Sequence, residues 1–292
     1  MTIYDFDVTF RFDKIRLNLS YVNTIKDSIS ENRRLYREFA EQNLIEFNAL
    51  QECCDTFERT ILIDAYTYVE QLVKNFYYEL IGKDKHENSY LCKFINEKIP
   101  VEKFSPKIKF KEIESGIRSE LTNDFKFILN PNKSEVIMYD EMVKSRHRYA
   151  HTGEYFFDYT KFKDVLIVIE YISNELSMVT REGIKYRAEF QNLVRETLKL
   201  SSKANSLCKN NGNNVNKIRS RECFRELKNH CVTVCKTCGK QLSEYALLSS
   251  SYEKIEEFSQ VDLRCYANAS AKSVELFNEL SQNIIPPKKN KD

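Results

Sequence analysis

Residues 134–183 read SEVIMYDEMVKSRHRYAHTGEYFFDYTKFKDVLIVIEYISNELSMVTREG, and this stretch decides the fold. It contains two helical patterns separated by a short turn. The first begins at Ser134, a residue type that caps helix N-termini, and runs with apolar residues at helical spacing toward Gly153. The second begins at Asp158 or Thr160. Its apolar stripe consists of Phe162, Val165, Leu166, Ile169, Ile172, Leu176 and Val179.

The rest of the chain is also mainly helical in pattern. From about Asn23 to Gly82 the apolar residues keep a spacing of three and four, and Gly82 is typical of a helix C-terminus. Residues 4–13 instead alternate between apolar and polar, which predicts a short strand or an extended arm. We expect a short helix over Leu91–Lys98 and one more strand at Lys107–Ile113. With only 6 Gly and 5 Pro, the chain has few of the residues that form the many tight turns of an all-β fold.

Gly183 marks the boundary between two expected regions. A length of 292 residues makes two domains a fair expectation. We predict that residues 1–183 form a helical bundle. Residues 184–292 are more polar and contain an Asn-rich loop at 210–216 and a Cys-rich stretch at 223–238. We predict a helical, Cys-containing C-terminal region of unknown role there.

The bulk composition is typical of a soluble cytoplasmic protein. Hydrophobic residues make up 42% of the chain and charged residues 30%. The longest aliphatic run, Val165–Ile169, is too short to cross a bilayer, and the N-terminus lacks the pattern of a signal peptide. Nine cysteines without a repeating spacing indicate reduced thiols. Because the net charge is only +2, contact with nucleic acid would require a local basic patch.

One short segment carries residues suited to catalysis. The chain has four histidines, and His147 and His151 both lie in Arg146-His147-Arg148-Tyr149-Ala150-His151. On a helix His147 and His151 share a face, as do Arg148 and His151, and the long side chain of Arg146 can reach the same side. Imidazole exchanges protons near neutral pH, and guanidinium stabilises negative charge that develops on a phosphate. These are the groups that RNA cleavage by a 2′-hydroxyl requires.

The Arg-x4-His spacing by itself is weakly specific, because Arg225–His230 repeats it. In that second copy Glu226 follows the arginine and would pair with its guanidinium. In the first copy His147 follows the arginine, Ala150 is small and Gly153 closes the helix. We therefore favour the first copy. The alternative interpretation is a basic, solvated helix end that the helix dipole favours.

The segment Arg146–His151 resembles the signature of the HEPN ribonuclease family, in which an arginine is followed by a polar residue and four to six residues separate the arginine from a histidine. The helical pattern is similar over about residues 20–180, although only the motif is specific. The resemblance implies a helical bundle that dimerises with its motifs at a shared cleft and cuts RNA without a metal. Carried over, Arg146 and His151 would be the catalytic pair and His147 the supporting polar residue.

The resemblance also implies partners. RNA would be the substrate, the chain would form a homodimer, and an antitoxin or a subunit of an anti-phage defence complex would be a further partner. Lys144 and Arg148 would hold the RNA backbone. Some family members carry a modified tyrosine two residues after the histidine; here that position is Gly153, and Tyr155 lies two residues further on. The alternative is a non-catalytic helical subunit that binds RNA or protein in a defence complex.

Two cysteines suggest half of a metal site. Cys235 and Cys238, with Gly239 following, are spaced like one knuckle of a structural zinc site. A second pair at the required spacing is absent from the sequence. The residues that could complete the site are Cys208, Cys223, His230, Cys231 and Cys265. The alternative is a set of reduced thiols in a helical subdomain, and we expect no other cofactor.

Overall fold

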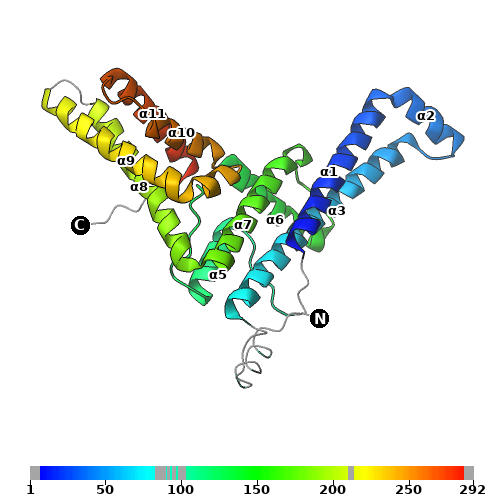
Figure 1. Cartoon of the computed structure of the whole chain (residues 1–292). Helices are drawn as coiled ribbons and strands as arrows, with labels where there is room; N and C mark the ends of the chain where they lie inside the picture. Colours follow the sequence, from blue (N-terminus) through cyan, green and yellow to red (C-terminus); the bar gives the residue numbers. More distant parts are fainter. Residues whose placement is uncertain are drawn as a thin grey trace. The chain divides into compact units, whose positions relative to one another are not determined.

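In a computed structural model of the chain, the described residues are 7–82, 90, 93, 97, 103–209 and 214–285. They form ten α-helices and one short 3-10 helix (Figure 1). Within these residues the β contact is a single bridge between Leu129 and Ile284. The prediction of a mainly helical protein is therefore confirmed. None of the described helices combines the length and the apolar character that crossing a bilayer requires.

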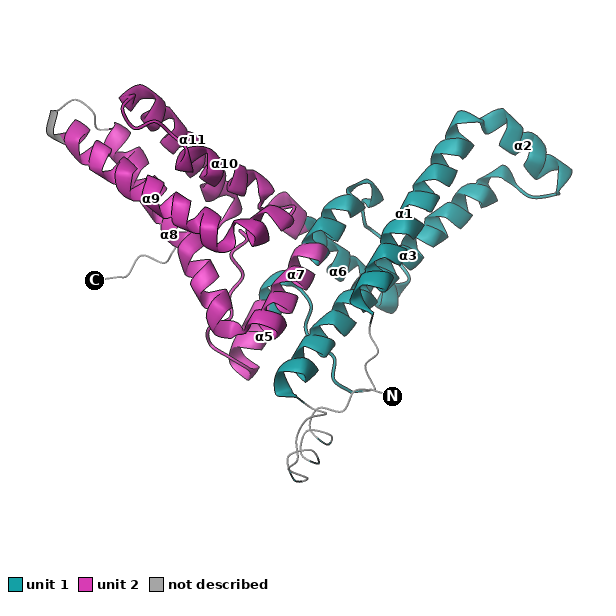
Figure 2. Cartoon of the chain, viewed as in Figure 1, with its two compact units in different colours: residues 1–113, 138–169 teal, residues 114–137, 170–292 magenta. Residues whose placement is uncertain are grey.

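The chain divides into two compact units (Figure 2). Unit 1 is drawn from residues 1–113 and 138–169, and unit 2 from residues 114–137 and 170–292. The sequence predicts a single boundary at residue 183. The units instead exchange segments of the chain, and each border between them falls inside a helix. These helices are α5 (Phe110–Glu120), α6 (Ser134–Thr152) and α7 (Phe162–Glu182).

Unit 1 is built around a helical hairpin, which we call the arm. It consists of α1 (Val8–Glu31), α2 (Arg33–Gln42) and α3 (Phe47–Ile81). Helices α1 and α3 pack against each other along the arm, and α2 connects them at its end (Figure 1). The buried side chains of α1 recur every three or four residues, so they form one apolar face toward α3. These side chains are Phe12, Ile15, Leu19, Val22 and Ile29.

The predicted N-terminal strand is wrong over residues 8–13, which form the first turns of α1. The helix begins there because the Asp7 carboxylate accepts a hydrogen bond from the Phe10 N–H at 2.9 Å. Alternation over so few residues also fits a helix, since Phe12 falls on the same buried face as Ile15. Residues 4–6 of that prediction lie outside the described residues.

The second predicted strand, Lys107–Ile113, is also wrong. The Phe110 N–H donates to the Asp140 carboxylate at 2.9 Å, and α5 begins at this residue. A carboxylate at the N-terminus of a helix satisfies a backbone donor that has no partner within the helix. The short helix expected over Leu91–Lys98 lies mostly outside the described residues.

The predicted end of the motif helix is confirmed, whereas Ser134 is the first residue of α6 rather than its N-cap, and its hydroxyl donates to the Glu135 carboxylate at 2.9 Å. Helix α6 ends at Thr152, and Gly153 follows it with φ of +72° and donates its N–H to the Tyr149 carbonyl at 2.9 Å. After the turn, the Asp158 carboxylate caps a 3-10 turn by accepting from the Thr160 N–H, and α7 follows. Helix α7 ends before Gly183. Local turn chemistry therefore sets where the motif helix stops.

Unit 2 is a helical bundle that encloses an irregular segment at residues 125–129. Its main helices are α8 (Ile184–Lys209), α9 (Asn214–Glu244), α10 (Ser249–Ser259) and α11 (Tyr266–Asn283). The Tyr171 hydroxyl accepts hydrogen bonds from the Ile128 and Leu129 N–H groups at 3.2 Å. The Ile285 N–H donates to the Ile128 carbonyl at 2.9 Å, so the residues after α11 hold this segment from another side.

Helix α8 carries several buried polar side chains. The Arg187 guanidinium pairs with the Glu175 carboxylate, and their side chains are 1% and 0% exposed. Burial lowers the pKa of Arg187 to about 10. Gln191 donates to the Lys126 carbonyl. The ion pair compensates the two buried charges only in part, and Gln191 satisfies a backbone acceptor that the bundle removes from water.

Candidate active site

The predicted motif occupies the last turns of α6, and one face of this part of the helix is open to solvent. Four of the exposed side chains follow one another at intervals of three, one and three residues, and on a helix this spacing places them on the same side. They are Lys144, His147, Arg148 and His151. Met142, Val143 and Ser145 are buried on the other side, and Arg146 is half-buried between the two. The structure therefore brings the predicted catalytic and RNA-binding residues together on one surface.

Tyr66 of α3 holds two of these residues. The Arg146 guanidinium carbon lies 4.3 Å from the centroid of the Tyr66 ring. The His147 ring meets the same ring edge-on, with centroids 5.4 Å apart and planes at 88°. Tyr66 is itself buried, with 6% of its surface exposed. A buried ring in contact with a guanidinium and an imidazole restricts the rotamers of both.

Sequence reasoning missed Tyr66. In the sequence it belongs to the apolar stripe of α3, about 80 residues before Arg146, and no spacing links the two. The one available signal was its residue type, because a tyrosine on a buried helix face can supply an aromatic surface as well as volume.

The electrostatics of the site favour a neutral His147. Partial burial, followed by the positive charges of Arg146 and Lys109, lowers the pKa of this imidazole below its usual 6.5. A neutral imidazole can accept a proton, which is what a general base requires. Burial raises the pKa of Tyr66, so its phenol stays protonated beside the two residues it contacts.

The arginines of the motif are not neutralised by acidic side chains. Over the described ranges, neither Arg146 nor Arg148 forms an ion pair with a carboxylate. Lys144 differs, because its ammonium group lies 2.5 Å from the Glu141 carboxylate. Two guanidinium groups are therefore free for an anionic ligand, whereas Lys144 would have to leave its partner.

The turn after the motif adds aromatic residues beside it. The Arg148 guanidinium carbon lies 5.2 Å from the centroid of the Phe156 ring, which is 63% exposed. Tyr155 faces the other way, with its ring 5.7 Å from the Arg59 guanidinium carbon and its hydroxyl oxygen buried. Burial raises the pKa of Tyr155. Phe156 thus presents an open aromatic face next to the motif, and the sequence analysis had not identified it.

In the second Arg-x4-His copy, the histidine, His230, has a structural role. His230 Nε2 lies 3.0 Å from the Leu193 carbonyl oxygen of α8, within unit 2. The expectation that Glu226 would neutralise Arg225 is wrong, since the Glu226 carboxylate pairs with Lys203 at 3.1 Å. The imidazole of this copy links two helices, in contrast to the open imidazoles of the first copy.

The cysteine pair contributes no ligand cluster. Cys235 and Cys238 both lie on α9, and the Cys238 thiol donates to the Val234 carbonyl of the same helix at 3.3 Å. Burial raises the pKa of Cys238 to about 12, which keeps it protonated. In the part of the chain that the structure describes, no group of three or more His, Cys, Asp or Glu side chains is arranged to hold a metal ion.

Comparison of the chain with protein-family models, with curated proteins and with solved structures found no match.

Proposed function

We propose that this chain is a metal-independent endoribonuclease of HEPN type that cleaves RNA by attack of a 2′-hydroxyl on the adjacent phosphate. The observation that carries the proposal is the half-buried Arg146 beside the exposed His147, Arg148 and His151. The two guanidinium groups of this set have no carboxylate partner in the described residues. Imidazoles can move both protons of the reaction, and a guanidinium can stabilise the charge on the phosphate.

The proposed reaction uses these residues as follows. His151 acts as the general base or acid, and Arg146 binds the phosphate whose negative charge grows in the transition state. The 2′-oxygen loses its proton and bonds to phosphorus, while the bond to the 5′-oxygen breaks and that oxygen gains a proton. The products are a 2′,3′-cyclic phosphate and a 5′-hydroxyl. His147 supports the pair, and Arg148 and Lys144 hold the RNA backbone.

A homodimer is part of the proposal. One chain supplies a single catalytic pair, Arg146 and His151. A second copy related by a two-fold axis would supply the same pair on the facing side of the cleft. A role in defence or as a toxin, with an antitoxin or defence-complex partner, rests on the resemblance of the motif.

The direct test is cleavage of end-labelled single-stranded RNA by the purified chain in excess chelator. We expect Arg146→Ala and His151→Ala to lose at least about a hundredfold in rate. Arg225→Ala is the matched control, because it removes an exposed arginine from the second Arg-x4-His copy. Equal cleavage by all four proteins would show that a contaminating nuclease is responsible and would end the proposal.

The second candidate is a non-catalytic subunit that binds RNA or a partner protein. It is favoured by one observation: both imidazoles of the motif are exposed in the single chain. This candidate predicts that RNA or a partner binds to wild type and that no cyclic-phosphate ends appear. The end chemistry of RNA from the same assay therefore distinguishes the two candidates.

A further inference from the structure

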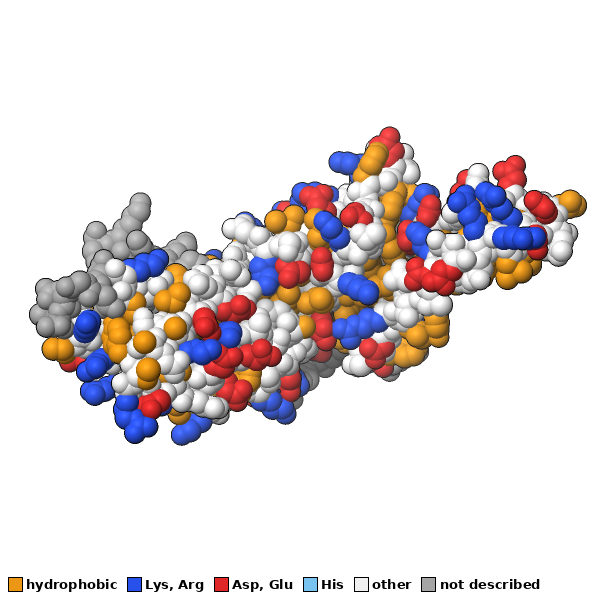
Figure 3. Space-filling model, turned by 90° about the horizontal axis from the view of Figure 1, so that it is seen from above, with side chains coloured by type: hydrophobic (Ala, Val, Ile, Leu, Met, Phe, Trp, Pro, Cys, Tyr) orange, Lys and Arg blue, Asp and Glu red, His pale blue; other side chains and the backbone are white. Residues whose placement is uncertain are grey.

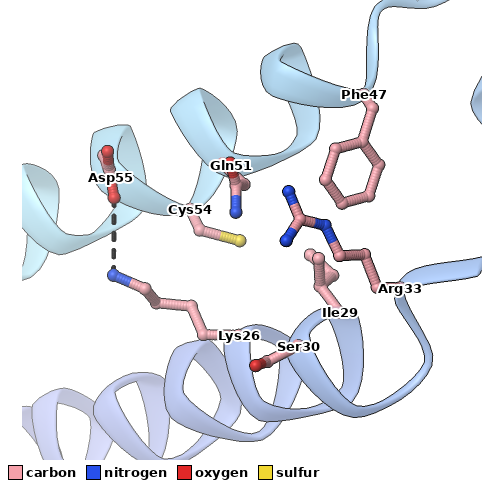
Figure 4. A pocket seen from close by; sticks show the side chains of 8 residues that line it. All are labelled: Lys26, Ile29, Ser30, Arg33, Phe47, Gln51, Cys54 and Asp55. Atoms are coloured by element: carbon pink, nitrogen blue, oxygen red, sulfur yellow. Dashed lines mark hydrogen bonds and ion pairs between the residues drawn. The ribbon is translucent and has the colours of Figure 1, made fainter. Parts of the chain in front are cut away.

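A pocket in unit 1 lies on the arm, away from the motif along α3. It has a volume of about 380 Å³ and lies between α1, the start of α2 and the first turns of α3 (Figure 4). The buried side chains of Ile29 and Cys54 form its apolar part. Its other lining residues are Lys26, Ser30, Arg33, Phe47, Gln51 and Asp55.

The Phe47 ring, with two arginines near it, forms one side of this pocket. The guanidinium carbons of Arg33 and Arg37 lie 5.6 and 5.5 Å from the centroid of the Phe47 ring. In the described part of the chain neither arginine pairs with a carboxylate, whereas Arg34 between them pairs with Glu38 at 3.0 Å. Lys and Arg side chains lie at the α2 end of the arm in Figure 3, with Asp and Glu side chains among them. An aromatic ring with guanidinium groups near it is the kind of surface on which an unpaired base stacks.

Polar groups of the pocket can read the edge of such a base. Figure 4 shows the side-chain amide of Gln51 directed toward the space beside Arg33. An amide both donates and accepts, and this one makes no hydrogen bond to another described residue. At the other end Lys26 pairs with Asp55 at 3.4 Å and with Glu58 at 2.7 Å, so that lysine is already neutralised. Of the two cations that line the pocket, Arg33 is the one without a carboxylate partner among the described residues.

The distance from the pocket to the motif suits a short RNA strand. Fifteen residues of the continuous helix α3 separate Gln51 from Tyr66, the residue that contacts Arg146. At 1.5 Å per residue this is about 22 Å. At about 3.4 Å per stacked nucleotide, roughly six nucleotides cover that length.

We infer that the pocket receives an unpaired base of the RNA cleaved at the motif, about six nucleotides from the scissile phosphate. The inference rests on the proposed function, and it identifies the substrate as single-stranded RNA. The base stacks on Phe47, the phosphates near it are held by Arg33 and Arg37, and Gln51 contacts the edge of the base. At the other end of the strand, Phe156 and Arg148 form a second aromatic and basic pair.

Binding to an inactive protein tests this inference apart from catalysis. Fluorescence anisotropy would compare a 12-nucleotide and a 4-nucleotide single-stranded RNA on the His151→Ala chain. We expect Phe47→Ala or Arg33→Ala in that background to weaken binding of the 12-mer about tenfold. Binding of the 4-mer, which is too short to reach both sites, should change less than binding of the 12-mer. Arg34→Ala is the matched control on the same helix and should leave both affinities unchanged.

Phe47→Tyr keeps an aromatic face and should restore tight binding of the 12-mer, which separates stacking from a folding defect. If Phe47→Ala and Arg33→Ala bind the 12-mer as tightly as the parent while wild type still cleaves RNA, the inference is overturned and the proposed function stands. If the 12-mer binds no protein and wild type cleaves nothing, both are overturned.

Discussion

Tyr66 contacts both Arg146 and His147 through its ring, and this contact determines which way two motif residues point. The positive charge of Arg146 also lies close enough to His147 to disfavour protonation of the imidazole. At the scale of single residues, the chemistry of the site thus depends on three neighbouring side chains from two helices.

Removing the charge of Arg146 should change the titration of its neighbour. We expect Arg146→Gln to raise the pKa of His147 toward 6.5, and Arg146→Lys to leave it lowered. Titration of the imidazole signals by NMR measures this directly. Since the folded pKa lies below the unfolded one, wild type should also lose stability as the pH falls from about 6.5 through the folded pKa. His147→Gln should lack this loss, and an unchanged pKa in Arg146→Gln would contradict the geometry.

Gly153 should resist substitution for a backbone reason alone. Its φ is +72°, and a Cβ placed there would meet no atom within 4 Å. Gly153→Ala should therefore lower the free energy of unfolding by about 1 kcal/mol through left-handed strain. Gly153→Asn should cost less, because asparagine tolerates this conformation better. Urea denaturation of the three proteins measures the difference, and equal costs for Ala and Asn would argue against this explanation.

At the scale of elements, helices α7 and α8 are joined by an ion pair that is almost fully buried. Arg187 and Glu175 are almost fully buried, and Arg187 Nε and Nη1 have no hydrogen-bond partner among the described residues. Such a pair is held by its mutual attraction, and loss of one member leaves an uncompensated charge in the core.

Glu175→Ala should therefore lower the free energy of unfolding by about 3–5 kcal/mol. The double variant Glu175→Met with Arg187→Leu should regain most of this, since an apolar pair of similar volume removes both charges. The control is Glu38→Ala, which breaks the exposed pair with Arg34 and should cost less than about 1 kcal/mol. A cost for Glu175→Ala as small as that of Glu38→Ala would mean that the charge of Arg187 reaches water.

At the scale of the whole molecule, the proposed nuclease needs two copies of the chain. Sedimentation equilibrium of wild type should give the mass of a dimer, which is twice 34.6 kDa. Arg146→Ala and His151→Ala should each be inactive as homodimers. Mixed under conditions that exchange subunits, they should recover part of the activity, because one cleft then contains an intact arginine and an intact histidine. A monomer that cleaves RNA at full rate would contradict the shared cleft.

Much of the secondary structure could be predicted from local patterns. The apolar stripes and the glycines at 82, 153 and 183 placed the ends of three helices, and the motif fell on one helix face as its spacing required. The two strand predictions failed because a few alternating residues fit a helix equally well. In each case a carboxylate, Asp7 or Asp140, supplies the hydrogen-bond acceptor at the start of a helix.

The sequence by itself determined the helical class, the C-terminal ends of α3, α6 and α7 and the shared face of His147 and His151, because these follow from interactions over three or four residues. Only the tertiary structure decided that Tyr66 contacts the motif, that the Phe47 ring lies near Arg33 and Arg37, and how the two compact units divide the chain. Such contacts join residues that are far apart in the sequence or on different helices, and they depend on how whole helices pack.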